Sequence, residues 1–148
     1  MWKLNTADRL DSWKRLRTEI TQLDIETALQ KVVDVWSTAP WQPFYLNYDE
    51  SKEWPDPWTL IEENYYCDLA KALGMLYTLH LSGHKDCEHM ELLIMHRESD
   101  HGQYNIVVVN EKYVLNLEHG EIVNKKSIPI ELCVTKCYTK EQLSLERF

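Results

Sequence analysis

Residues 66–75 read Tyr66-Cys67-Asp68-Leu69-Ala70-Lys71-Ala72-Leu73-Gly74-Met75, and this run predicts a helix that begins near its cysteine. Four leucines recur at helical spacing from the run onward: Leu69, Leu73, Leu76 and Leu79. The pattern continues to about His80, and Ser82-Gly83 is typical of a helix end. Asp56-Pro57 is typical of an N-cap followed by the first helical residue. We therefore predict a third helical region between Asp56 and about His80.

Cys67 has two interpretations. A thiol at a helix N-terminus lies near unpaired amides and the positive end of the helix dipole, which favour the thiolate form of a nucleophile. Alternatively, Cys67 packs in the core as a small hydrophobic residue. The adjacent Asp68 carboxylate opposes thiolate formation if it lies close.

The residues outward from this helix predict an α+β fold. Two helices are expected before it, at about 6–17 with Thr6 as N-cap and from Asp24 to about 36. After Gly83 the periodicity changes to that of strands, expected at 90–95, 104–109, 113–117, 122–123 and 128–138. Pro129 lacks an amide donor, so the last strand is expected at a sheet edge. The expected architecture is N-terminal helices packed on a C-terminal antiparallel β-sheet.

The length of 148 residues predicts one domain with a sizeable core. We divide it into a helical part (1–38), a Trp/Pro-rich loop (39–57), the cysteine helix with the sheet (58–138) and a tail (139–148). A formal net charge of −8 without a basic cluster argues against nucleic-acid binding. No apolar run is long enough for a membrane span or a signal peptide. The four cysteines are expected as free thiols in a reducing compartment, and no cofactor is expected.

The Trp/Pro-rich loop is a candidate partner-binding segment. Tryptophan is enriched at interaction hot spots, so Trp41, Trp54 and Trp58 could anchor a protein partner or line a pocket. The alternative is that these rings cover the sheet or fill the core.

Two further cysteine-containing segments carry residue types that suit metal or disulfide chemistry. His84, Cys87 and His89 are ligand types that suit zinc, but their spacing matches no closed structural pattern, and we favour a solvated loop and no metal. Cys133 and Cys137 share parity on a strand and are expected on one face, too far apart to form a disulfide.

The run 66–75 resembles the cysteine helix of transglutaminase-like proteins. Residues 103–109 and 112–117 resemble the strand pair that follows that helix, and the chain order cysteine, histidine, then Asn or Asp also matches papain-like proteins. The resemblance implies a transglutaminase-like (papain-like) core with Cys67 as nucleophile, His101 as general base and Asn116 as the orienting residue. Two departures stand out: His101 lies before the start of the strand, and Asn116 stands where the family has an aspartate.

The chain is also similar to a family of tailed-bacteriophage proteins, especially in residues 54–58 and 65–70. That similarity does not imply any particular activity. Together with the two departures, it favours a non-catalytic bacteriophage protein that contacts other phage structural proteins in the virion or its assembly. Such a protein would be found in the bacterial host cytoplasm during infection, or in the virion. The alternative is a small thiol hydrolase, a cysteine peptidase or amidase with a Cys67-His101-Asn116 triad.

Overall fold

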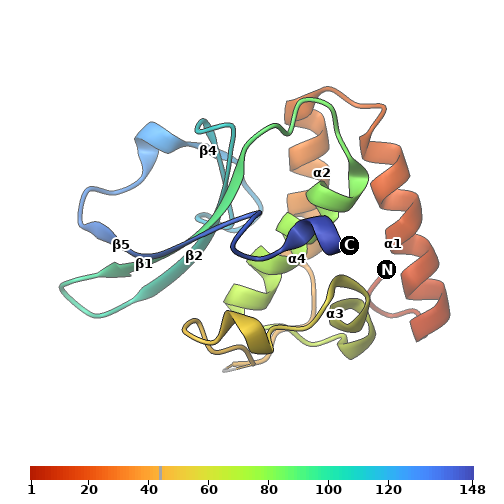
Figure 1. The fold of residues 1–148 in the computed structure, drawn as a ribbon, viewed down its shortest axis with the longest axis horizontal. Helices are drawn as coiled ribbons and strands as arrows, with labels where there is room; N and C mark the ends of the chain where they lie inside the picture. The colour runs from red at the N-terminus through yellow and green to blue at the C-terminus, as the bar shows by residue number, and fades with distance from the viewer. Residues whose placement is uncertain (44) are drawn as a thin grey trace.

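The computed structural model describes residues 1–43 and 45–148; Phe44, which the sequence places in the Trp/Pro-rich loop, lies outside them. The described chain folds as helices followed by an antiparallel sheet, so the predicted α+β class is confirmed (Figure 1). The α-helices are α1 (Thr6–Ile20), α2 (Ile25–Ser37), α3 (Pro57–Glu63) and α4 (Asp68–Ser82). The strands are β1 (Met90–Arg97), β2 (Gln103–Val109), β3 (Tyr113–Leu115), β4 (Val123–Asn124) and β5 (Leu132–Thr139). Three short 3₁₀ turns complete the chain: η1 (Ser51–Glu53), η2 (Lys125–Ser127) and η3 (Leu145–Arg147).

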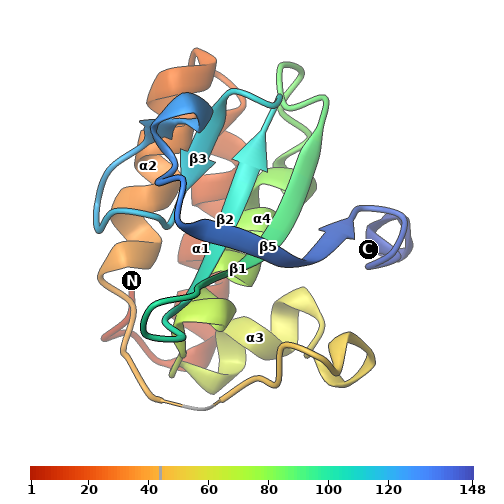
Figure 2. The same cartoon turned by 90° about the vertical axis from the view of Figure 1, so that its left-hand side faces the viewer.

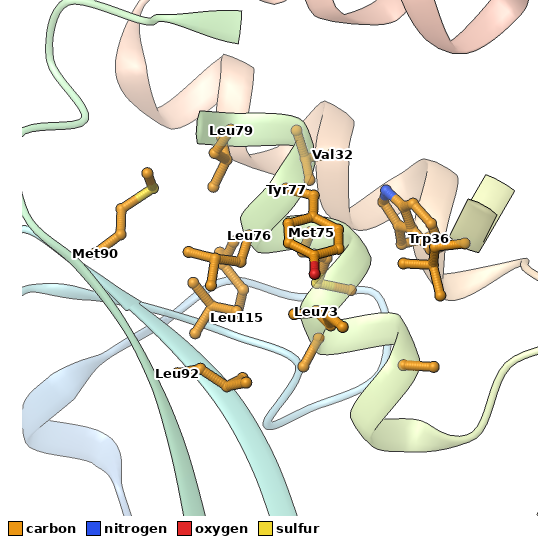
Figure 3. Packing of buried hydrophobic residues seen from close by; sticks show 14 of the residues in the cluster. Val32, Trp36, Leu73, Met75, Leu76, Tyr77, Leu79, Met90, Leu92 and Leu115 are labelled. Atoms are coloured by element: carbon orange, nitrogen blue, oxygen red, sulfur yellow. The ribbon is translucent and has the colours of Figure 1, made fainter. Parts of the chain in front are cut away.

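Helix α4 is the central element of the core. Ten of its fifteen residues are buried, because α1, α2 and α3 pack on one side of it and β1 and β2 on the other. Figure 3 shows Leu73 and Leu76 of α4 with Leu92 and Leu115 of the sheet, and Val32 and Trp36 of α2 on the far side. A helix that is apolar around its whole circumference is stable only when enclosed in this way. The leucine spacing in the sequence therefore marks the helix that organises the fold.

Two buried tryptophans meet α4 at a single turn. A side chain at Gly74 would overlap the Trp36 ring, so only glycine allows α2 to approach this closely. One turn later, the buried Thr78 hydroxyl accepts hydrogen bonds from Trp13 Nε1 at 2.9 Å and Trp36 Nε1 at 3.0 Å. The same hydroxyl donates to the Gly74 carbonyl at 2.7 Å. This contact joins three helices through one oxygen atom.

The predicted third helical region is in fact two helices. Asp56 caps α3 as expected, and its side chain accepts from Thr59 N–H at 2.8 Å. The helix then ends at Asn64, whose φ of 55° lies in the left-handed region and breaks the helical path. Cys67 follows as the N-cap of α4. The N-cap of α1 is Asn5 rather than Thr6, because the Asn5 side chain accepts from Asp8 N–H at 2.9 Å.

The sheet has the strand order β4-β3-β2-β1-β5, with every neighbouring pair antiparallel. Figure 2 shows the strands on the near side of α4. β5 is an edge strand, as predicted, although it begins at Leu132 and not at 128.

The pairing of β1 with β5 corrects one expectation. A register shift lies between Ile94 and Met95, so Cys133 is opposite His96 whereas Cys137 is opposite Leu93. Alternate residues of β1 point to opposite faces, and the two thiols contact side chains on different faces: Cys133 contacts Glu98, and Cys137 contacts Glu91. The two cysteines therefore do not share a face.

Among the helices of residues 1–43 and 45–148, none has the length and apolar character needed to cross a bilayer.

Candidate functional site

Cys67 lies at the junction between the Trp/Pro-rich loop and α4. It is the N-cap residue of α4, and its side chain forms no capping hydrogen bond. The residue before it, Tyr66, pairs with the loop: Tyr66 N–H donates to Pro40 O at 2.8 Å, and Gln42 N–H donates to Tyr66 O at 3.0 Å. These bonds fix the thiol at the positive end of the α4 dipole. Cys67 retains 8% exposure, so the site is nearly closed but reachable.

A cleft with a volume of about 910 Å³ opens beside Cys67. Its walls come from the loop before α3, the first turn of α4 and the first part of β2. The described lining residues are Trp41, Pro43, Tyr45, Leu46, Asn47, Tyr48, Glu53, Cys67, Asp68, Leu69, Gln103 and Asn105. The cleft therefore combines aromatic and aliphatic walls with a small set of polar groups, as ligand-binding sites do.

The polar groups next to Cys67 form one hydrogen-bonded network around Asp68. Asn105 Nδ2 on β2 donates to Asp68 Oδ2 at 2.9 Å. Asn116 Nδ2, just after β3, donates to Asp68 Oδ1 at 3.2 Å and to the Asn105 carbonyl at 2.8 Å. Gln103 Nε2 in turn donates to Asn105 Oδ1 at 2.8 Å. The groups that β2 and β3 present to the cysteine end of α4 are therefore amides.

Asp68 is in contact with solvent through the cleft but is surrounded by protein on its other sides. This partial desolvation raises the pKa of the Asp68 carboxyl, and the hydrogen bonds from Asn105 and Asn116 act in the opposite direction. One turn along α4, burial lowers the pKa of the Lys71 ammonium, and the Asp68 charge partly opposes that effect. The carboxylate is thus held by amide donors and not by a close ion pair.

His101, the predicted general base, lies on the exposed turn between β1 and β2. Its φ is 60°, and its backbone N–H donates to the Arg97 carbonyl at 2.8 Å. It is not among the described residues that line the cleft, and neither is any other histidine. His96 packs edge-on against Tyr48, a lining residue, but its Nδ1 is 2.9 Å from the Thr135 hydroxyl. Of the three predicted catalytic residues, the structure brings Cys67 and Asn116 to the Asp68 network and leaves His101 outside the lining.

The three tryptophans predicted to bind a partner have different environments. Trp41 is 65% exposed and lines the cleft. Trp54 is buried, donates from Nε1 to the Asn47 carbonyl at 2.8 Å and packs against Tyr138, so its ring holds the loop to the sheet. Trp58 is half-exposed on α3 and packs against Trp13. Only Trp41 offers a large free face to a ligand in the cleft.

The segment between α4 and β1 does not group His84, Cys87 and His89 as zinc ligands. His84 is buried, and both of its ring nitrogens have partners: Nε2 lies 2.8 Å from the Leu23 carbonyl, and Nδ1 accepts from Asp86 N–H at 3.1 Å. Burial raises the pKa of the Cys87 thiol to about 11. Within the part of the chain that the structure describes, no three His, Cys, Asp or Glu side chains are grouped to hold a metal ion.

Gln103 and Asn105 are site residues that no motif in the sequence indicates. Both precede buried residues of equal parity, Val107 and Val109, that face α4. Strand alternation places all four residues on one face of β2. The odd-numbered positions 103, 105, 107 and 109 are therefore the sequence pattern that puts Gln103 and Asn105 on the face toward α4.

Comparison with known proteins identifies the fold. No protein-family model and no curated protein matches this chain. Among solved structures, calcium-bound Legionella pneumophila LapG superposes with a TM-score of 0.72 at 16% identity, covering 91% of this chain and 76% of LapG. EGTA-treated LapG gives a TM-score of 0.72 at 15% identity, covering 91% and 74%. A third LapG structure gives 0.70 at 15% identity, covering 90% and 75%.

This similarity confirms the predicted fold class: the chain has a transglutaminase-like fold. The neighbours come from a bacterium and carry no sign of a phage origin, so the expected phage context and virion role stay predictions.

Proposed function

We propose that this protein binds an extended polypeptide segment in the Cys67 cleft without hydrolysing it. The observation that carries the proposal is the make-up of the cleft: about 910 Å³ of open, aromatic-walled space, with amides and no histidine among the described lining residues near Cys67. The resemblance to transglutaminase-like and papain-like proteins supports a polypeptide as the ligand. A nucleophilic cysteine needs a base within hydrogen-bond reach, and a neutral amide cannot accept the thiol proton.

The loop wall of the cleft suits an extended chain. Trp41 presents a free ring, and large aromatic side chains at a concave surface are typical binding anchors. The exposed amides of Asn47 and Gln103 line the same cleft and can pair with peptide carbonyls and N–H groups. A polypeptide occupying this space would also cover the Cys67 thiol.

Binding can be tested with fluorescein-labelled hexapeptide pools, measured by fluorescence anisotropy. We expect wild type to bind a subset of pools, and Trp41→Ala to weaken that binding by about tenfold or more, as for an aromatic hot spot. Trp58→Ala is the matched control, because it removes an exposed tryptophan outside the cleft lining. A bound peptide should also slow alkylation of Cys67 by iodoacetamide but leave Cys133 unaffected. Equal binding by wild type and Trp41→Ala would overturn the proposal.

A thiol hydrolase is the second candidate. It is favoured by the position of Cys67 at the N-cap of α4 and by the fold shared with LapG. In that case His101 would take the Cys67 proton, the thiolate would attack an amide carbonyl carbon, and the amine would leave with that proton; water would then hydrolyse the thioester and restore the thiol. For this, His101 would have to reach the thiol from outside the described lining of the cleft, with Asn116 orienting it.

Quenched fluorescent casein separates the two candidates. The binding proposal predicts the same background signal from wild type, Cys67→Ala and His101→Ala. Turnover by wild type that both substitutions abolish would establish the hydrolase and refute a purely binding role.

A further inference from the structure

The charged residues described in the lining of the Cys67 cleft are all acidic. Its described lining includes two carboxylates, Glu53 and Asp68, and no lysine or arginine. Three aromatic side chains line the same space: Trp41, Tyr45 and Tyr48. A carboxylate attracts a cation, and an aromatic face does so through its ring quadrupole. An anionic ligand would meet repulsion from the carboxylates with no cation among the described lining residues to offset it.

The two carboxylates differ in how they are engaged. Both oxygens of Asp68 accept amide hydrogen bonds, from Asn105 and Asn116. Glu53, at the end of η1, has no hydrogen bond or ion pair to its carboxylate within residues 1–43 and 45–148. On the same loop, Asp49 is already paired with Lys136 at 3.2 Å. Glu53 is therefore the lining carboxylate that remains available to a ligand.

We infer that Glu53 is the specificity-determining residue of this cleft and selects polypeptide segments that carry a lysine or arginine side chain. This inference rests on the proposed function, since it concerns the same cleft. The long apolar stem of such a side chain can lie along the aromatic wall while its charged end reaches the carboxylate. An exposed ion pair and a cation–π contact are each modest, so together they predict a preference of about three- to tenfold.

The test uses three labelled hexapeptides that are identical except for Lys, Gln or Glu at one central position, drawn from a pool that wild type binds. We expect wild type to bind the Lys peptide about three- to tenfold more tightly than the Gln peptide, and the Glu peptide least. The preference should shrink when salt is raised, because partly exposed charges are screened. Glu53→Gln should reduce the preference for Lys over Gln to the smaller part that the cation–π contact with the aromatic wall supplies.

Glu50→Gln is the matched control. It removes the same charge from the same loop, but Glu50 is not among the described lining residues, so the preference should remain. An equal loss in both variants would show a general field effect and overturn the role of Glu53. Equal binding of the Lys and Gln peptides by wild type, with binding still dependent on Trp41, would overturn the selectivity but leave the proposed function intact. If Trp41→Ala instead binds all three peptides as tightly as wild type does, the proposed function itself is refuted.

Discussion

Asn105 donates a hydrogen bond to Asp68 across 2.9 Å, linking β2 to the first turn of α4 beside the cysteine. The Asn105 side chain is almost completely buried, and its own carbonyl oxygen accepts from Gln103 at 2.8 Å. A side chain at this position on β2 is therefore fixed toward the cysteine end of α4. Because asparagine can neither take up nor release a proton at neutral pH, the position is occupied by a group that cannot act as a base.

Replacing Asn105 with histidine should make Cys67 more reactive. An imidazole at this position can accept the thiol proton, and a positioned general base contributes about 10²–10⁴ in rate where the geometry is refined. We expect Asn105→His to raise the rate of Cys67 alkylation by iodoacetamide at pH 6.5 by about tenfold, measured by peptide mapping in the mass spectrometer. Asn105→Gln, which supplies an amide and no base, is the control. Equal rates in the two variants would show that this part of β2 does not face the thiol.

Asp68→Asn should change how stability depends on pH. The Asp68 pKa is raised in the folded state, so folding favours the protonated carboxyl. This contribution is fully present below the ordinary value of 3.8 and is lost as the pH rises through the raised pKa. Urea unfolding across this range should therefore show wild type losing stability relative to Asp68→Asn as the pH increases. The same comparison with Asp11→Asn, on the exposed face of α1, gives the baseline. A wild type that gains stability relative to Asp68→Asn as the pH rises would contradict the assignment.

The sequence predicts the elements of this fold better than their junctions. The leucine spacing of α4 and the caps Asp24 and Asp56 depend on neighbours within a few residues, so they can be read locally. The break at Asn64 cannot be predicted from its neighbours in the sequence, because apolar residues continue at helical spacing on both sides of it. Its left-handed backbone follows from how Tyr66 pairs with the loop at Pro40, which is a contact between distant residues.

The candidate site is predictable only in part, because some of its features depend on nearby residues and others on contacts between distant ones. Cys67 is identified by its place at the start of a helix, and Asn116 by its place after a strand. The cleft itself is formed where residues 41–43 and 45–53 meet β2, and no periodicity in the sequence predicts that contact. Strand alternation gives the parity of Gln103 and Asn105, but choosing the face that meets α4 requires the sheet register.

Thr78→Val should be strongly destabilising for a substitution that hardly changes volume. It would leave two buried indole N–H groups, those of Trp13 and Trp36, without an acceptor. Each unsatisfied buried donor costs about 1–3 kcal/mol, so we expect a loss of about 2–5 kcal/mol in the free energy of unfolding. Thr78→Ser keeps the hydroxyl and should lose only about 1 kcal/mol for the missing methyl group. Similar losses in both variants, measured by urea denaturation, would show that packing and not hydrogen bonding dominates at this position.

Cys137 should be alkylated slowly although it is exposed on β5. Partial burial, and then the hydrogen bond and charge of Glu91, raise the pKa of its thiol to about 11, so little thiolate is present at pH 8. Glu91→Gln removes the charge and should accelerate its reaction with iodoacetamide severalfold. Cys133 contacts Glu98 on the other face of the sheet. The alkylation rate of Cys133 should therefore stay unchanged in Glu91→Gln and rise in Glu98→Gln. Because the register shift in β5 separates the two thiols, acceleration of both cysteines by Glu91→Gln would contradict the observed pairing of β1 with β5.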